Sequence, residues 1–185
     1  DELGAEPVVG HEEEGDSDDD SERSNESEES EDEAQPAQHL PSFLTACESL
    51  QIRPNSTVVK ILREFDMYTD TQLDFNRNFI GDRGCVALMQ CLREGQHLEF
   101  LGLANQGLRN RAVVALAETF KDSPFLKELD ISHNIISDGG GRAILELVRG
   151  TPSLKRVNYG YNRMSSSLRV RLEEAIRANN EAEAE

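Results

Sequence analysis

The sequence predicts an α/β repeat fold in which four consecutive units each contribute one short strand and one helix. Apolar residues and an amide recur every 28 residues, most regularly as Leu98, Leu101 and Leu103, then Leu126, Leu129, Ile131 and Asn134. A second pattern is an apolar pair four residues apart, which is the spacing of one helix face. These pairs are Leu88 and Leu92, Leu116 and Phe120, Ile144 and Val148, and Leu172 and Ile176. Both patterns share one register, as expected for a solenoid of repeats.

The repeats span residues 70–97, 98–125, 126–153 and 154–181. Alternating apolar residues at Leu101 and Leu103 predict a strand in the first half of each repeat. Helix starts are expected at side chains that can accept a backbone N–H bond, and the candidate N-caps are Asp82, Asn110, Asp138, and Ser165 or Ser166. The first and third helices should stop at Gly95 and Gly150.

Residues 39–69 precede the repeats, and we expect two helices there. Pro41 stands in the first turn of an apolar run, where its missing N–H costs no helical bond. Asn55 or Ser56 is the expected N-cap of the second helix. A stack of repeats leaves an apolar end that needs covering, so we interpret this segment as an N-terminal cap. At the other end, the fourth repeat is an atypical, capping repeat. The polar residues from 178 onward, and residues 182–185 in particular, are expected to fray.

Residues 1–38 form an acidic segment rich in Ser, Glu and Asp. Positions 1–35 hold 17 acidic residues and one basic residue, Arg23, so they carry −16 of the formal net charge of −17. Dense like charge with few large apolar groups predicts disorder. Ser17 and Ser30 each stand three residues before an acid, which acid-directed kinases prefer, so both are candidate phosphorylation sites. A solubilising role and binding to basic surfaces both remain open.

Several function classes find no support in the sequence. It has no Gly-rich phosphate loop, no His-Glu-x-x-His motif, no nucleophile elbow and no Cys-x-x-Cys pair, so we predict no enzyme activity, cofactor or metal. A near-neutral domain with an acidic tail should not bind nucleic acid. No apolar run is long enough to span a membrane. Three cysteines without zinc spacing predict reduced, buried thiols, which fits the cytosol or nucleus. Because the chain begins with Asp1 instead of Met, we expect a processed chain or part of a longer one.

Residues 70–181 resemble the ribonuclease-inhibitor-like subclass of leucine-rich repeats. The resemblance rests on the leucine pattern, the 28-residue period, and Gly84 and Gly140 early in their helices. It implies a short right-handed solenoid arc with a parallel sheet on the concave side and helices on the convex side. The sequence departs from the pattern at Asp70, Gln106, Ala112 and Leu168. Because Gln is one methylene longer than the usual Asn, the ladder of turn amides is expected to be imperfect in the second repeat.

Further resemblances indicate particular settings. The lead-in, with residues 43–47, Pro54 and Ser56, is similar to the start of several leucine-rich-repeat proteins of cilia and flagella. Ran GTPase-activating proteins share the repeat subclass, but their arc is longer and their acidic segment follows the repeats. Tropomodulin-like actin cappers share a tyrosine-bearing last repeat, but their N-terminal actin and tropomyosin helices are missing from this sequence. Acidic nuclear phosphoprotein-like proteins carry their acid tract at the C-terminus.

The strand pattern predicts which side chains face the concave side, because side chains alternate across a strand. The candidate protein-binding residues are Asp74, Asn76, Phe100, Gly102, Ala104, Glu128, Asp130, Ser132, Arg156, Asn158 and Tyr161. Phe100 is the expected apolar anchor, with a hollow beside it at the small residues Gly102 and Ala104. Asp74 and Asp130 would form an acidic rim suited to a segment bearing an apolar residue and Lys or Arg. The alternative is that Phe100 folds onto its own strand neighbours.

These observations predict a non-catalytic protein-interaction module or scaffold that binds a protein segment on its concave face. The expected location is the cytoplasm, in a cilium, flagellum or cytoskeletal assembly, with the nucleus as second choice. Two alternatives remain open: a regulator of an enzyme such as a small GTPase or phosphatase, and actin-filament capping of the tropomodulin-like type. The expected partner is a protein, with no nucleic acid and no membrane, and the chain on its own is expected to be a monomer.

Overall fold

The computed structural model describes residues 39–66, 68–93 and 97–182. All of these residues belong to one compact unit, Gln35–Glu185. The acidic segment lies outside the described residues. The predictions of disorder and of phosphorylation there therefore stay predictions.

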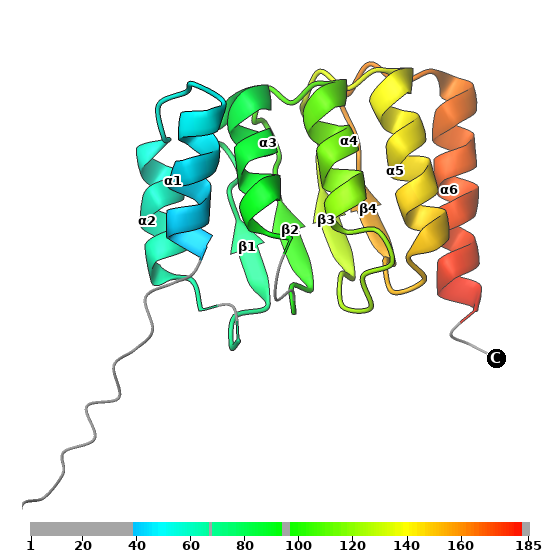
Figure 1. The fold of residues 1–185 in the computed structure, drawn as a ribbon. Helices are drawn as coiled ribbons and strands as arrows, with labels where there is room; N and C mark the ends of the chain where they lie inside the picture. The colour runs from blue at the N-terminus through cyan, green and yellow to red at the C-terminus, as the bar shows by residue number, and fades with distance from the viewer. Residues whose placement is uncertain (1–38, 67, 94–96, 183–185) are drawn as a thin grey trace, which may run out of the picture. The chain divides into compact units, whose positions relative to one another are not determined.

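A parallel sheet of four strands forms the frame of the compact unit (Figure 1). The strands follow one another in chain order as β1 (Gln72–Asp74), β2 (Phe100–Gly102), β3 (Glu128–Asp130) and β4 (Arg156–Asn158). Each residue pairs with the one 28 positions later, as Leu73 pairs with Leu101 and Leu101 with Leu129. The predicted α/β repeat fold, with one strand and one helix per 28 residues, is confirmed.

The helices of the described residues are α1 (His39–Ser49), α2 (Ser56–Glu64), α3 (Gly81–Cys91), α4 (Asn110–Thr119), α5 (Asp138–Gly150) and α6 (Ser166–Glu181). Helices α3 to α6 stand side by side over one face of the sheet, and α1 packs against α3 and α2 (Figure 1). Phe43 of α1 and Leu62 of α2 are fully buried. These two helices therefore cover the apolar end of the first repeat.

One apolar core runs through all four repeats between the strands and the helices. The central strand residues Leu73, Leu101 and Leu129 are at most 1% exposed, as are the first members of the helix pairs, such as Leu88 and Leu116. Burying one such side chain stabilises the fold by about 1.5–3 kcal/mol. At the last strand, Val157 and Tyr159 are only partly buried, because β4 has no further strand beside it.

Buried side-chain amides link neighbouring repeats at the turn after each strand. The Oδ1 atom of Asn134 accepts the N–H groups of Gln106 (2.9 Å) and Leu108 (3.0 Å), and its Nδ2 donates to the carbonyl of Leu103 (2.9 Å). Asn162 repeats this link, since its Nδ2 donates to the Ile131 carbonyl at 2.9 Å. Each amide thus satisfies backbone groups of the preceding repeat, which would otherwise be buried without partners.

Gln106 completes this amide ladder, so the expectation of an imperfect ladder was wrong. Its Oε1 accepts the Ile80 N–H at 3.0 Å, and its Nε2 donates to the Phe75 carbonyl at 2.6 Å and to the Ala104 carbonyl at 2.9 Å. The side chain is only 1% exposed. The longer glutamine side chain still forms these bonds to the preceding repeat, so the extra methylene does not interrupt the ladder.

The N-caps predicted at Asp82, Asn110 and Asp138 were also wrong, because each of these residues lies within its own helix. Their side chains instead accept the backbone N–H of the N-cap residue in the next repeat. Asp82 Oδ1 accepts from Arg109 (2.7 Å), Asn110 Oδ1 from Ser137 (3.0 Å) and Asp138 Oδ1 from Ser165 (2.6 Å). Capping therefore crosses from one repeat to the next.

The other predicted helix boundaries agree better with the structure. Asn55 is the N-cap of α2, where its Oδ1 accepts from two backbone N–H groups, and Ser165 is the N-cap of α6. Helix α5 ends at Gly150 as expected, whereas Gly95 lies outside the described residues.

The prediction that the chain frays from residue 178 was wrong. Helix α6 continues to Glu181, and Asn179 is buried within it. The Nδ2 of Asn179 donates to three carbonyls around the end of α5: Val148 (2.8 Å), Leu154 (3.0 Å) and Thr151 (3.1 Å). This one amide therefore ties the end of α6 to the end of α5 and to the turn that follows it.

The Gln106→Ala variant should lose roughly 2 kcal/mol of unfolding free energy, because the Ile80 N–H loses its partner and the Phe75 carbonyl keeps only its bond from the Asn78 N–H. Urea unfolding followed by circular dichroism measures the loss. Gln90→Ala, which removes an exposed amide from α3, is the matched control and should change stability by less than about 0.5 kcal/mol. Equal losses in the two variants would contradict a structural role for the ladder.

Hydrogen bonds from the backbone and hydroxyl of Ser165 hold the pKa of Asp138 below its usual value. A lowered folded-state pKa adds stability above the unfolded pKa, and this stability is lost as the pH falls through the folded pKa. The Asp138→Asn variant should therefore lose less stability than the wild type on going from neutral pH to below about pH 4. The urea midpoints of the two proteins, measured from neutral pH to below about pH 4, test this difference in acid sensitivity. Identical acid slopes for the two proteins would show that the cross-repeat cap contributes nothing.

Candidate functional site

The exposed face of the sheet carries most of the residues predicted to bind a protein. Gln72 and Asp74 are exposed on either side of Leu73, and Arg156 and Asn158 are exposed on either side of Val157. In the central strands, Phe100, Glu128 and Asp130 are partly buried and Gly102 is buried. We define the sheet face by its polar and aromatic side chains: Asp74, Phe100, Glu128, Asp130, Arg156 and Asn158.

The hollow predicted beside Phe100 is filled, so that part of the prediction was wrong. Gly102 is buried, and a Cβ atom added to it would lie 2.7 Å from Asp74 Oδ1 and 2.9 Å from Asn76 Nδ2. Asn76 is fixed in this position because its Oδ1 accepts the Ala104 N–H at 2.6 Å. Side chains of the first repeat therefore occupy the space above the second strand.

Three other candidate residues also differ from the expectation. Phe100 is only partly exposed, as in the alternative interpretation of this ring. Ser132 is only 4% exposed, so its side chain is not available to a partner. Tyr161 lies in the loop beyond β4 and belongs to a different surface from the strand residues.

The charges of the sheet face are paired across neighbouring strands. The guanidinium of Arg156 donates to Glu128 Oε2 from Nε (3.0 Å) and from Nη2 (2.5 Å). Asn158 Nδ2 donates to Asp130 Oδ2 at 3.2 Å. Arg156 neutralises Glu128, so the acidic character of this face rests on Asp74 and Asp130. Exposed pairs of this kind add little stability, so their main effect is to orient the side chains.

A second exposed surface lies along the loops that follow the strands. Its residues, which we call the loop ridge, are Arg77, Phe79, His133, Ile135, Tyr161 and Arg163. Phe79 is 74% exposed and Tyr161 is 80% exposed. The rings of His133 and Tyr161, which come from neighbouring repeats, stack with centroids 4.2 Å apart and an angle of 14° between their planes.

The sequence analysis named Tyr161 as a candidate binding residue but did not include Phe79. A signal for Phe79 was present, because a bulky residue stands there where the next repeat has Gly107. Both positions have a positive φ, which glycine adopts readily and phenylalanine does not.

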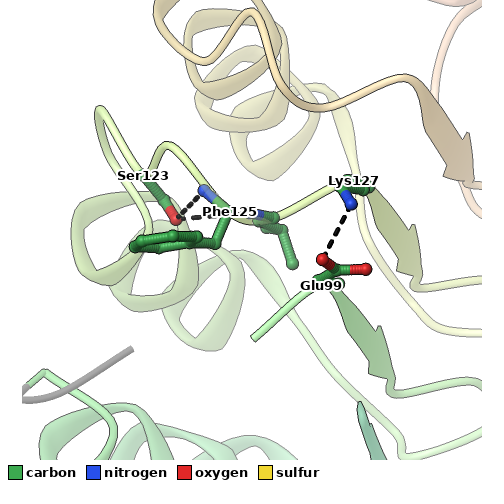
Figure 2. A network of polar contacts seen from close by, with 5 residues as sticks. Glu99, Ser123, Phe125 and Lys127 are labelled. Atoms are coloured by element: carbon green, nitrogen blue, oxygen red, sulfur yellow. Dashed lines mark hydrogen bonds and ion pairs between the residues drawn. The ribbon is translucent and has the colours of Figure 1, made fainter. Parts of the chain in front are cut away.

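The opposite edge of the sheet carries a separate polar network (Figure 2). Lys127 Nζ and Glu99 Oε1 form an ion pair of 2.7 Å before β2 and β3, and Ser123 Oγ accepts the Phe125 N–H at 3.4 Å. Phe125 is 38% exposed and packs against the ring of His97 with a centroid distance of 4.7 Å. These contacts order the turns that lead into the strands.

The helix side has a groove of about 530 Å³ between α4 and α5. Val114, Ala117 and Leu147 line its floor, while side chains of both charge signs lie around it, among them Glu118 and Arg149. The described residues give no indication of what would occupy this groove.

Structural features relevant to other functions are few in the described part of the chain. Cys47, Cys85 and Cys91 are free and buried, as predicted. No group of three or more His, Cys, Asp or Glu residues there could hold a metal ion. None of the described helices is long and apolar enough to cross a bilayer.

A family model described as leucine-rich repeat matches residues 71–89 and 122–145. The chain carries leucine-rich repeats. Each matched segment contains one strand of the sheet with the start of the helix that follows it. No curated protein sequence matches the chain closely enough to count as a relative.

Two solved structures are reported as similar to this chain. The first, described as leiomodin-1 actin-binding site 2, matches with a TM-score of 0.52 and 14% identity over 62% of this chain and 83% of that chain. The second, a tropomodulin C-terminal domain from Caenorhabditis elegans, matches with a TM-score of 0.44 and 20% identity over 70% of this chain and 95% of that chain. The leiomodin-1 similarity concerns the fold alone. The ribonuclease-inhibitor-like subclass and the ciliary resemblance stay predictions.

Burial raises the pKa of the Cys85 and Cys91 thiols to about 12, so both should be almost entirely protonated in the folded protein. Since the thiolate is the reactive form, a thiol-specific reagent such as Ellman's reagent should label these cysteines only after urea unfolding. Absorbance of the released chromophore counts the reacted thiols. Rapid reaction of either cysteine in the folded protein would contradict this buried arrangement.

Proposed function

We propose that this protein is a non-catalytic interaction module that binds a protein segment on the exposed face of its parallel sheet. The observation that carries the proposal is that helices cover only one face of the sheet in the described residues. Parallel sheets are usually covered on both faces. Here the second face presents polar side chains from β1, β3 and β4 and the ring of Phe100 from β2, and hydrogen bonds between repeats link the side chains of β3 and β4.

The chemistry of the sheet face favours a segment with basic residues beside an apolar one. Asp74 and Asp130, on the first and third strands, accept hydrogen bonds but have no ion-pair partner among the described contacts, and Phe100 lies between them on the second strand. Glu128 contributes less, because Arg156 already neutralises it. Complementary charges of this kind set the specificity and association rate of a complex more than its affinity.

The double variant Asp74→Lys and Asp130→Lys tests this proposal in a quantitative pull-down with the full chain as bait. Proteins that bind the sheet face should be recovered at least about tenfold less well by the variant. The matched control, Glu118→Lys with Glu146→Lys, makes the same charge change on the helix side and should recover them as the wild type does. If the sheet-face variant recovers these proteins as well as the wild type does, or if the control variant fails to recover them, the sheet face is not the binding surface.

Actin is a specific candidate partner, because one of the similar structures is described as an actin-binding site. This candidate rests on fold similarity and on the cytoskeletal setting that it suggests. Co-sedimentation of the full chain with filamentous actin provides the test. Actin binding is supported if the protein pellets with actin saturably and the sheet-face variant pellets less. Actin is removed as a candidate if the protein pellets no more than it does without actin. Regulation of a small GTPase or phosphatase, and a place in a cilium or flagellum, have no structural observation in their favour.

A further inference from the structure

The loop ridge holds three rings in a backbone conformation that bulky side chains rarely adopt. Phe79, His133 and Tyr161 have φ angles of 49°, 55° and 56°, in the left-handed region. Each such residue costs on the order of 1–3 kcal/mol. Burial does not offset this cost, because Phe79 and Tyr161 are 74% and 80% exposed.

The second repeat shows that the fold itself does not require these rings. There the position equivalent to Phe79 is Gly107, and the position equivalent to His133 and Tyr161 is Asn105. Both residues have a positive φ, which glycine and asparagine adopt at little cost. The rings of the other repeats therefore add strain and exposed apolar surface that the fold does not require, and contact with a partner would use both.

The rings lie close enough together for one ligand to reach them all. Neighbouring strands are about 4.8 Å apart, so the three repeat steps from Phe79 to Tyr161 cover about 15 Å. An extended segment of about five residues has this length. Ile135, which is 36% exposed, adds an aliphatic side chain from the third repeat.

The charge around the rings is positive. Arg77, Arg109 and Arg163 are exposed along this edge. Helices α3 to α6 also begin here, and a helix N-terminus carries partial positive charge. The acids that border these loops are Asp74 and Asp130 at the strand ends and Asp82 and Asp138 in the helices. All four accept backbone N–H groups, whereas the loops between strand and helix contain arginines and no acid.

We propose that the loop ridge binds an extended acidic segment of a protein partner, whose aromatic or aliphatic residues pack on Phe79 and on the His133–Tyr161 stack. This surface begins three residues beyond the strand ends that carry the sheet face, and it takes a ligand of the opposite charge. Residues 1–35 carry a charge of −16 and repel any anionic ligand of this protein. A nucleic acid bears one negative charge per nucleotide and is repelled more strongly than a short peptide with a few glutamates, so the peptide is favoured.

Fluorescence polarisation with the full chain tests the proposal. The probe is a short fluorescein-labelled peptide in which glutamates flank a central tryptophan. Three comparison probes replace the glutamates with lysine, replace the tryptophan with alanine, or present a single-stranded RNA of similar length. The glutamate–tryptophan peptide should bind most tightly, and its affinity should fall as the salt concentration rises.

The decisive variant combines Phe79→Gly, His133→Asn and Tyr161→Asn, which copies the residues of the second repeat. It should weaken binding of the acidic peptide by at least about tenfold. Because it relieves backbone strain, it should also keep or raise the urea midpoint, so loss of binding would not reflect unfolding. Val170→Asn is the control, since it removes a side chain that is 52% exposed on α6 and should leave binding unchanged.

The proposal is overturned if the acidic peptide does not bind, if the triple variant binds it as the wild type does, or if the lysine peptide or the RNA binds more tightly. These outcomes are independent of the test of the sheet face. That test uses Asp74 and Asp130 and a ligand of the opposite charge.

Discussion

Side-chain amides that cross from one repeat to the next form the interaction on which the rest of this structure depends. Gln106, Asn134 and Asn162 each bond to backbone groups of the preceding repeat, across separations of 26 to 31 residues. The carboxylates and amide at the helix starts make a second set of cross-repeat bonds. Each repeat therefore completes the hydrogen bonding of its neighbour, and no single repeat can satisfy its own turns.

This arrangement determines what the protein can offer to partners. The helices shield one face of the sheet, while the other face keeps a regular set of polar side chains. Beyond each strand, the turn that carries the amide ladder places the residue before the amide in a left-handed conformation, as at Arg77, Asn105, His133 and Tyr161. The side chains at these four positions are exposed. A rigid frame thus holds the loop ridge in place before any ligand arrives, which lowers the entropic cost of binding.

The sequence was sufficient to predict the repeat, because a period of 28 residues with strand and helix spacings in one register leaves little choice of fold. It was less informative wherever side chains of two repeats meet. The hollow at Gly102 was inferred from its own strand, but Asp74 and Asn76 of the preceding repeat fill it. The cap at Asp82 was assigned to its own helix, but the carboxylate serves the next one. Local patterns do not show contacts between residues 28 positions apart unless the repeats are aligned in space.

The most direct test of the central claim, that a rigid repeat frame presents a binding ridge, is nuclear magnetic resonance of the isotope-labelled full chain titrated with the glutamate–tryptophan peptide. The account predicts amide shift changes at residues 77–79, 133–135 and 161–163. It also predicts that the ladder amides of Gln106 and Leu108 stay protected from hydrogen exchange throughout. Shift changes centred on the groove between α4 and α5, or rapid exchange of the ladder amides, would contradict it.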